Sequence, residues 1–176
     1  MTNIVRLPDI THINFELLRV SGVTNLFTDI ESTLAPYGDS QIDPYTAEFL
    51  ESQRAVGNIA TISLITNRRD PAFAKHMAEQ LGADAYLCPT SKDHRKPAPH
   101  MLHEAARMLG VSISSAVMVG DKLTGDMHAA RSAGVPYAVW VDRLGSTDHP
   151  GDRYLRRPYE RLHKRRYPDR LLIPIG

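Results

Sequence analysis

Short apolar segments alternate with helical segments along most of this chain, and this alternation limits the folds that it can adopt. Each apolar segment has the length of a buried strand. Parallel strands need a long crossover between them, and a helix usually supplies it. The predicted strands lie at residues 23–28, 59–65, 85–88, 116–119 and 137–141.

The helices between these strands are marked by their ends. Asp-Pro pairs at 43–44 and 70–71 are N-cap and first-turn signals, and Gly57 and Gly82 end the two helices that follow. Further helices are predicted at residues 15–20, 99–110 and 126–133. The pattern predicts an α/β fold, a three-layer Rossmann-like parallel sheet of about five strands with helices on both faces.

Composition narrows the classes of function. The chain has 176 residues, and its 21 Lys and Arg against 20 Asp and Glu give no global positive field that would indicate nucleic-acid binding. Its only cysteine, Cys88, cannot form an internal disulfide, which fits a reducing cytoplasm. Residues 1–20 lack the apolar core of a secretory signal, and no stretch approaches the roughly 18 apolar residues of a membrane span. We therefore expect a soluble, cytoplasmic protein.

Two carboxylates and a hydroxyl follow the first strand, at Asp29, Glu31 and Thr33. Residues two apart in a strand share a face, so these side chains could point into one crevice beyond the carboxyl end of the strand. Open α/β sheets bind their ligands in such crevices. Two carboxylates there provide a divalent-metal site, a nucleophile and a general acid or base. Alternatively, the strand ends in a polar loop whose acidic residues are only solvated.

Polar residues also accompany the later strands. They are Thr66 and Asn67 after the second strand, Lys96 before the fourth, and Asp121 and Asp126 after the fourth. Aspartates hold hard cations, hydroxyl and amide groups bond phosphate oxygens, and lysine offsets the charge of a transferring phosphoryl group. Taken singly, each has a structural alternative as a turn residue, a solvated lysine or a helix-terminal aspartate. Their order, each near the end of a strand, favours a phosphoryl-transfer site.

This order resembles the motifs of the haloacid dehalogenase superfamily of phosphatases. The first motif of that superfamily reads Asp-x-Asp-x-Thr, and residues 29–33 read Asp-Ile-Glu-Ser-Thr. The Thr-Asn pair at 66–67, the Lys-Pro pair at 96–97 and the segment 119–126 fit the later motifs. From about residue 7 to residue 141 the chain is similar to the small YqeG-like branch, which is related to phosphatidylglycerophosphate phosphatases.

The resemblance implies a role for each matching residue. Asp29 would attack phosphorus and form an aspartyl-phosphate, while Thr66 and Lys96 would bind the phosphoryl oxygens. The implied function is magnesium-dependent hydrolysis of phosphomonoesters, with phosphatidylglycerophosphate as a candidate substrate. The implied Mg²⁺ site comprises Asp29, the main-chain carbonyl of Glu31, Asp121 and the nearby Asp126.

Glu31 departs from the motif, which has Asp at that position to protonate the leaving group and then activate water. One extra methylene moves a carboxylate by about 1.5 Å, and a misplacement of about 1 Å can cost on the order of 100-fold in rate. Two functions therefore remain open: a working phosphatase, and a phosphate-binding scaffold in which Glu31 has disabled turnover. A receiver domain fits less well, because the third strand at 85–88 supplies no aspartate.

The remaining sequence predicts how ligands reach the site. The connections after residues 33 and 66 are too short to hold a cap domain, so the open site could accept a large or membrane-borne phosphate ester. The expected ligand is a phosphorylated small molecule or a lipid head group. We expect residues 1–142 to form the catalytic domain and residues 143–176 a basic extension containing proline and tyrosine. That extension is either a solvated tail anchored by its tyrosines or a patch for anionic lipids at the inner face of the membrane.

Overall fold

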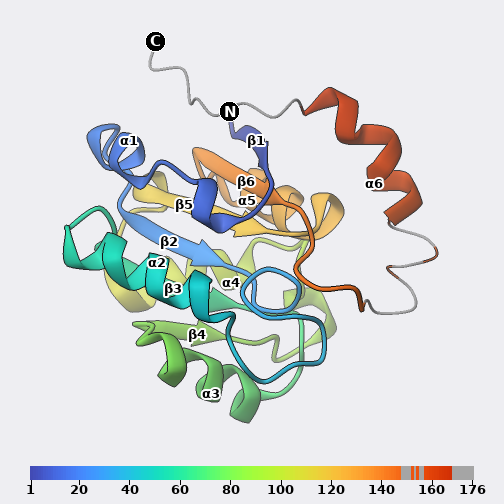
Figure 1. Ribbon diagram of the computed structural model, residues 1–176, viewed down its shortest axis with the longest axis horizontal. Coiled ribbons are helices and arrows are strands. Elements are labelled where there is room, and N and C mark those ends of the chain that lie inside the picture. Colours follow the sequence, from blue (N-terminus) through green and yellow to red (C-terminus); the bar gives the residue numbers. More distant parts are fainter. Residues whose placement is uncertain (148–151, 153, 155–156, 168–176) are drawn as a thin grey trace.

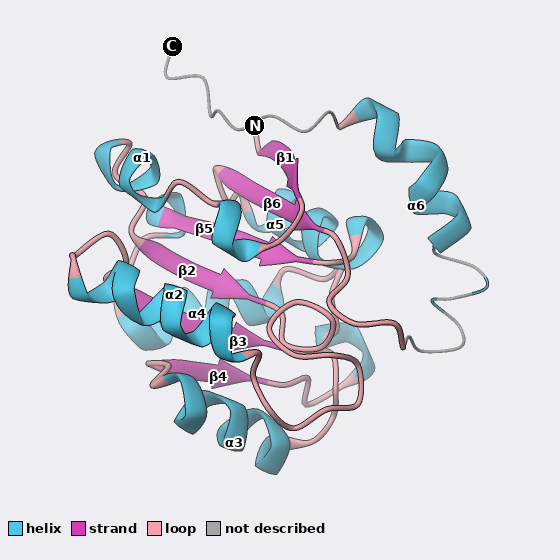
Figure 2. Ribbon diagram, viewed as in Figure 1, coloured by secondary structure: helices cyan, strands magenta, loops and turns pink. Residues whose placement is uncertain are grey.

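The computed structural model describes residues 1–147, 152, 154 and 157–167, and it contains one sheet flanked by helices (Figures 1 and 2). The order of the strands is β1-β6-β5-β2-β3-β4, and every neighbouring pair is parallel. The predicted parallel α/β fold is therefore confirmed. The strands are β1 (Asn3–Leu7), β2 (Asn25–Thr28), β3 (Thr61–Ile65), β4 (Ala85–Leu87), β5 (Ala116–Gly120) and β6 (Tyr137–Val141).

Strand β1 is absent from the sequence-based prediction of five strands. It lies at one edge of the sheet beside β6. Of its five residues, Val5 and Leu7 are buried. Between them, the guanidinium of Arg6 donates to Asp142 at 2.7 Å. In this edge strand apolar residues alternate with a charged residue, so it lacks the continuous apolar run of the central strands. Its sequence therefore does not indicate a buried strand.

Each face of the sheet has its own apolar core, because successive side chains of a strand point to opposite faces. Leu26 of β2 packs in the core that α1, α2 and α3 cover, whereas Phe27 packs in the core that α4 and α5 cover. This arrangement gives the three predicted layers. The helices are α1 (Phe15–Val20), α2 (Pro44–Ala55), α3 (Pro71–Leu81), α4 (His100–Leu109) and α5 (His128–Ala133).

The predicted helix starts have a clear physical basis. Asp43 accepts a hydrogen bond from the amide of Thr46 at 2.9 Å, and Asp70 accepts one from Phe73 at 3.0 Å. Each carboxylate thereby satisfies an amide that has no partner within the helix. Gly82 ends α3 in the left-handed region, with φ of 62°, which a glycine adopts without strain. Three short 3₁₀ segments connect other elements, namely η1 (Ile10–His12), η2 (Lys92–His94) and η3 (Ile113–Ser115).

The segment after β5 differs from the helix predicted at 126–133. A π-helical turn, η4 (Leu123–Met127), precedes α5, and the amides of Asp126 and Met127 both donate to the carbonyl of Lys122 at 2.9 and 3.3 Å. A π turn holds one more residue than an α turn, which helical periodicity does not predict. The wider turn brings the Asp126 side chain against the end of β5. A Cβ at Gly120 would lie 2.5 Å from the Cβ of Asp126.

The carboxyl edge of the sheet carries short connections. Between β2 and α2 the chain forms turns and one isolated bridge, from Glu31 to Ala35. The single helix between β3 and β4 is α3. Among the residues that the structure describes, no helix is both long and apolar enough to cross a membrane.

The basic extension contributes a helix that lies beside this edge, drawn in red in Figure 1. Glu160 accepts a hydrogen bond from the amide of Leu123 at 2.8 Å, and the ammonium of Lys164 lies 2.7 Å from a carboxylate oxygen of Asp142. These contacts join the extension to the ends of β5 and β6. The two elements are α6 (Arg157–His163) and η6 (Lys164–Arg166).

The described tyrosines of the extension differ in their surroundings. The ring of Tyr167 packs edge-on against Trp140, with centroids 6.1 Å apart, whereas Tyr154 and Tyr159 are exposed. Both the polar contacts and the packing of Tyr167 therefore attach the described part of the extension to the domain. Other parts of the predicted extension, including 168–176, lie outside the described residues.

The close approach of Gly120 to Asp126 gives a first prediction. We expect Gly120→Ala to destabilise the protein by about 1–3 kcal/mol, because the added methyl group overlaps a buried side chain. Denaturant unfolding measures the change. Gly125→Ala is the matched control, since its Cβ would lie 3.4 Å from the Cβ of Lys122, an ordinary contact. Equal stability of the two variants would contradict the expectation.

Candidate active site

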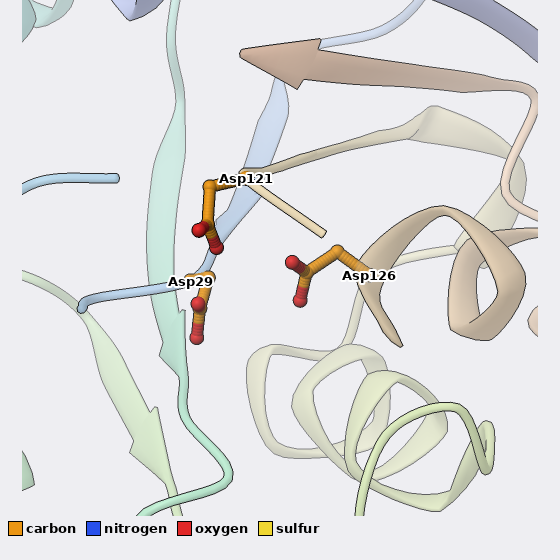
Figure 3. Close-up of side chains that lie close together, drawn as sticks. All are labelled: Asp29, Asp121 and Asp126. Carbon is orange, nitrogen blue, oxygen red and sulfur yellow. The ribbon is translucent and has the colours of Figure 1, made fainter. Parts of the chain in front are cut away.

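Three buried aspartates meet beyond the carboxyl ends of two neighbouring strands. Asp29 directly follows β2, Asp121 directly follows β5, and Asp126 lies in η4. One carboxylate oxygen from each lies within 4.8 Å of the others, and Figure 3 shows the three side chains gathered at this point. Parallel pairing of β2 with β5 brings the first two together, and the π turn brings the third.

Lys96 reaches the same place from the loop before α4. Its ammonium lies 2.7 Å from Oδ1 of Asp29 and 2.7 Å from Oδ1 of Asp126, and it donates to the carbonyl of Ile65 at 2.5 Å. Burial acts to lower the pKa of Lys96, but the attraction of Asp126 and Asp29 outweighs it and raises the pKa. Lys96 is therefore a charged group inside the protein.

Asn67 positions Lys96. The Asn67 side chain donates to the main-chain carbonyl of Lys96 at 2.9 Å and accepts from the Lys96 amide at 2.7 Å. Both polar groups of the Asn67 amide are thus engaged by the main chain that carries the lysine. The sequence placed Asn67 among phosphate-binding groups, whereas in the structure its contacts hold the loop of Lys96 against the end of β3.

Thr66, the residue after β3, is buried next to this loop. Its hydroxyl oxygen accepts a hydrogen bond from the amide of Arg68 at 3.0 Å. That bond uses an oxygen lone pair and leaves the hydroxyl hydrogen available to a ligand. Thr66 therefore retains the donor that phosphate binding requires.

The segment after Asp29 turns sharply and does not continue as a strand. The amides of Leu34 and Ala35 both donate to the carbonyl of Ile30, at 2.9 and 3.2 Å, and Ser32 has a positive φ of 66°. The strand ends at Thr28, where the sequence predicted its end, so the alternation of a strand does not extend over residues 29–33. Thr33 is buried, and its hydroxyl has no hydrogen-bond partner within the described residues.

Glu31 lies outside the group of three carboxylates. Its Oε1 is 3.5 Å from Nη1 of Arg68, and its side chain is 16% exposed. The guanidinium of Arg68 also stacks over the ring of Phe73 at 3.9 Å and lies 3.3 Å from Asp70. Arg68 lies in the loop before α3 (Pro71–Leu81), is held against the start of that helix, and pairs with the Glu31 carboxylate beside the site.

The surroundings of Asp121 match those of a cation ligand. Burial raises its pKa to about 7, although Lys122 and Arg157 act in the opposite direction. Arg157 bonds one carboxylate oxygen, and the other, Oδ1, has no hydrogen-bond partner in the described part of the chain. The main-chain carbonyl of Asp121 accepts from Trp140 at 3.0 Å. An unsatisfied buried oxygen beside two further carboxylates is suited to a hard cation.

The sequence analysis missed Arg157 and Glu160, which hold the Asp121 loop from outside the sheet. Arg157 donates to Glu160 at 3.0 Å, and Glu160 accepts from the amide of Leu123. The available signal was the spacing of three residues, which places an Arg-Glu pair on one helix face. The prolines and many basic residues of the extension made a helix there hard to predict from the sequence.

Comparison with known proteins identifies the family. Residues 3–134 match the haloacid dehalogenase-like hydrolases. YqeG of Bacillus subtilis, named as a probable phosphatase, is 27% identical over 161 residues, which cover 89% of this chain and 88% of that protein. D-glycero-alpha-D-manno-heptose-1,7-bisphosphate 7-phosphatase of Photorhabdus laumondii is 32% identical over 80 residues. That match covers 46% of this chain and 37% of the relative, so the chain spans well under half of the length of that enzyme.

Solved structures share the fold. A protein of Listeria monocytogenes aligns with a TM-score of 0.57 at 21% identity and covers 73% of this chain and 85% of its own. A HAD-like phosphatase from Mesorhizobium loti aligns with a TM-score of 0.54 at 21% identity, over 86% of this chain and 81% of its own. At these identities the likeness concerns the fold. Together with the match over most of the sequence, it establishes that the chain belongs to the haloacid dehalogenase-like hydrolase family.

Proposed function

We propose that this protein is a magnesium-dependent phosphomonoester hydrolase in which Asp29 forms an aspartyl-phosphate. The observation that carries the proposal is the buried ammonium of Lys96 between Asp29 and Asp126. Lys96 bonds one oxygen of Asp29, which leaves the other for attack on phosphorus. The same positive charge offsets the charge of an incoming phosphoryl group.

The proposed Mg²⁺ site consists of Asp29, Asp121 and Asp126, together with the main-chain carbonyl of Glu31. The close approach of the three carboxylates and the unpartnered Oδ1 of Asp121 support this assignment, since Mg²⁺ prefers oxygen ligands. When bound, the cation would neutralise charge on the phosphoryl oxygens.

The chain's own residues account for both half-reactions. Asp29 attacks phosphorus, the bond to the leaving oxygen breaks, and Glu31 gives that oxygen a proton. Lys96 and Thr66 hold the phosphoryl oxygens, with Asn67 acting through Lys96. Glu31 then takes a proton from water, which attacks the phosphorus of the aspartyl-phosphate and releases inorganic phosphate.

For the substrate, phosphatidylglycerophosphate is our first candidate. The resemblance to the YqeG-like branch and the short connections over the site support a large or membrane-borne phosphate ester. The protein would then act in the cytoplasm and contact the inner face of an anionic membrane through its basic extension. Phosphorylated small molecules are the alternative substrates, since the matching Photorhabdus laumondii enzyme is named for a heptose bisphosphate.

A second candidate function is a phosphate-binding scaffold without turnover. Its support is the position of Glu31, which pairs with Arg68 at the rim and does not join the three aspartates. In this case the site would bind Mg²⁺ and phosphate, and the basic extension would recruit a partner.

Asp29→Asn tests the nucleophile. We expect hydrolysis of p-nitrophenyl phosphate with Mg²⁺ to fall by at least about 1,000-fold, because an amide cannot form the phosphoenzyme. Asp93→Asn is the matched control, since Asp93 is exposed and lies in η2. An Asp29→Asn protein that hydrolyses the ester as fast as the parent would end the assignment.

Thermal unfolding tests the metal site independently of turnover. At Mg²⁺ about tenfold above its dissociation constant, binding stabilises the folded state by about 1.4 kcal/mol, or about 3–5 °C in Tm for a chain of this size. We expect EDTA to reverse this shift and Asp121→Asn to abolish it, while Asp93→Asn retains it. A full shift in Asp121→Asn would remove Asp121 from the metal site.

Glu31→Asp separates the two candidate functions. In a working hydrolase limited by a displaced acid, we expect the shorter side chain to raise kcat by about 10–100-fold and Glu31→Gln to lower it. The measurement is phosphate release under saturating substrate. Activity in Glu31→Asp alone, with none in the parent, would instead favour the scaffold.

A further inference from the structure

A cavity of about 360 Å³ lies between α6 and the ends of β5 and β6. Asp121, Trp140 and Asp142 line it from the sheet, and Arg161 is among the residues that line it from the helix. Asp121 also belongs to the group of three carboxylates, so the cavity shares this residue with the proposed phosphoryl site. Its volume lies within the range of small-molecule sites in proteins.

The helix side of the cavity is basic because its cationic residues recur at helical spacing. Arg157, Arg161 and Lys164 stand at positions i, i+4 and i+7 of one continuous segment, which places them on the same face. All three line the cavity. The regular spacing distinguishes this face from the rest of the basic extension.

Two carboxylates of the cavity are in contact with Arg157. Its guanidinium pairs with Asp121 and lies 3.0 Å from Glu160. Glu160 also accepts from the amide of Leu123. These negative charges are therefore held by the protein and do not face an incoming anion unopposed.

The third carboxylate, Asp142, is balanced from two sides. Arg6 and Lys164 each place a nitrogen 2.7 Å from one of its oxygens. Arg143 and Arg161 add two more positive charges to the lining. With Arg6 included, five cationic side chains thus accompany three carboxylates around this space. By this count cationic side chains outnumber carboxylates around the cavity, which favours an anion.

We propose that this cavity binds a second anionic group of the substrate. This inference rests on the proposed hydrolase function, because a second anion of the substrate can reach the cavity only if the first phosphate occupies the proposed site beside Asp121. The preferred substrates are phosphomonoesters that carry another phosphate, or a phosphodiester, a few bonds from the phosphate that is cleaved. A free bisphosphate and a phospholipid head group share this chemistry.

Paired substrates test the proposal. Propanediol bisphosphate carries the second anion, and propyl phosphate lacks it. We expect Arg161→Glu to raise KM for the bisphosphate by about tenfold and to leave KM for propyl phosphate within about twofold, because a charged hydrogen bond is lost for one substrate only.

Arg166→Glu is the matched control for net charge. Arg166 lies in the same segment, is exposed and does not line the cavity. We expect this variant to behave like the parent with both substrates. Equal changes in KM for the two substrates in Arg161→Glu, or no change with either, would overturn the proposal.

A binding measurement separates this proposal from the hydrolase function. In an Asp29→Asn background, calorimetry should give propanediol bisphosphate an affinity about tenfold higher than that of propyl phosphate, and Arg161→Glu should remove the difference. If the Asp29→Asn protein shows this preference but the parent hydrolyses neither ester, the anion-binding proposal is supported and the hydrolase function is overturned. Turnover of both esters without the preference would do the reverse.

The source of the second anion is assigned in the same assays. Short-chain phosphatidylglycerophosphate, used below its micelle concentration, supplies a phosphodiester in place of the second phosphate. A KM well below that of propanediol bisphosphate, lost in Arg161→Glu, supports the lipid head group. Equal KM values, with the same loss, support a free bisphosphate.

Discussion

The buried ammonium of Lys96 holds together four separate parts of the chain. It lies 2.7 Å from Asp29 and from Asp126 and donates to the end of β3 at Ile65. Carboxylates this close together and this deeply buried repel one another, and burial raises the pKa of Asp126. Removing one partner from a buried ion pair typically costs about 3–5 kcal/mol. The site and the packing of its loops therefore depend on the same contact.

Cationic side chains surround the three buried aspartates. Three cations, Lys96, Lys122 and Arg157, act on this group in the protein alone. Two of them also pair with other carboxylates, Lys122 with Asp152 at 3.1 Å and Arg157 with Glu160 at 3.0 Å. Burial acts to lower the pKa of Lys122, but Asp121 and the neighbouring carboxylates raise it. A divalent cation and a phosphate dianion together add no net charge. The binding of both would thus leave the net charge of the proposed site unchanged, whereas either alone would change it.

The basic extension is part of the same electrostatic arrangement. Arg157 and Glu160 hold the Asp121 loop on one side, while the sheet holds it on the other through Trp140. A segment whose composition suggests a solvated tail therefore lies against a proposed metal ligand. This position also makes one wall of the cavity beside the site, which links the extension to the choice of substrate.

The sequence by itself determined the order of the elements and the residues at the strand ends. Apolar runs, Asp-Pro starts and closing glycines are local signals, so five strands, the helices α1 to α5 and the positions of Asp29, Lys96 and Asp121 near strand ends were predictable. The tertiary structure decided the edge strand β1, the π turn of Asp126 and the docking of Arg157 on Asp121. The edge strand and the docked arginine depend on contacts between residues far apart in the chain, and the π turn adds one residue to a helical turn. Local sequence signals report neither, because both depend on how the folded chain packs.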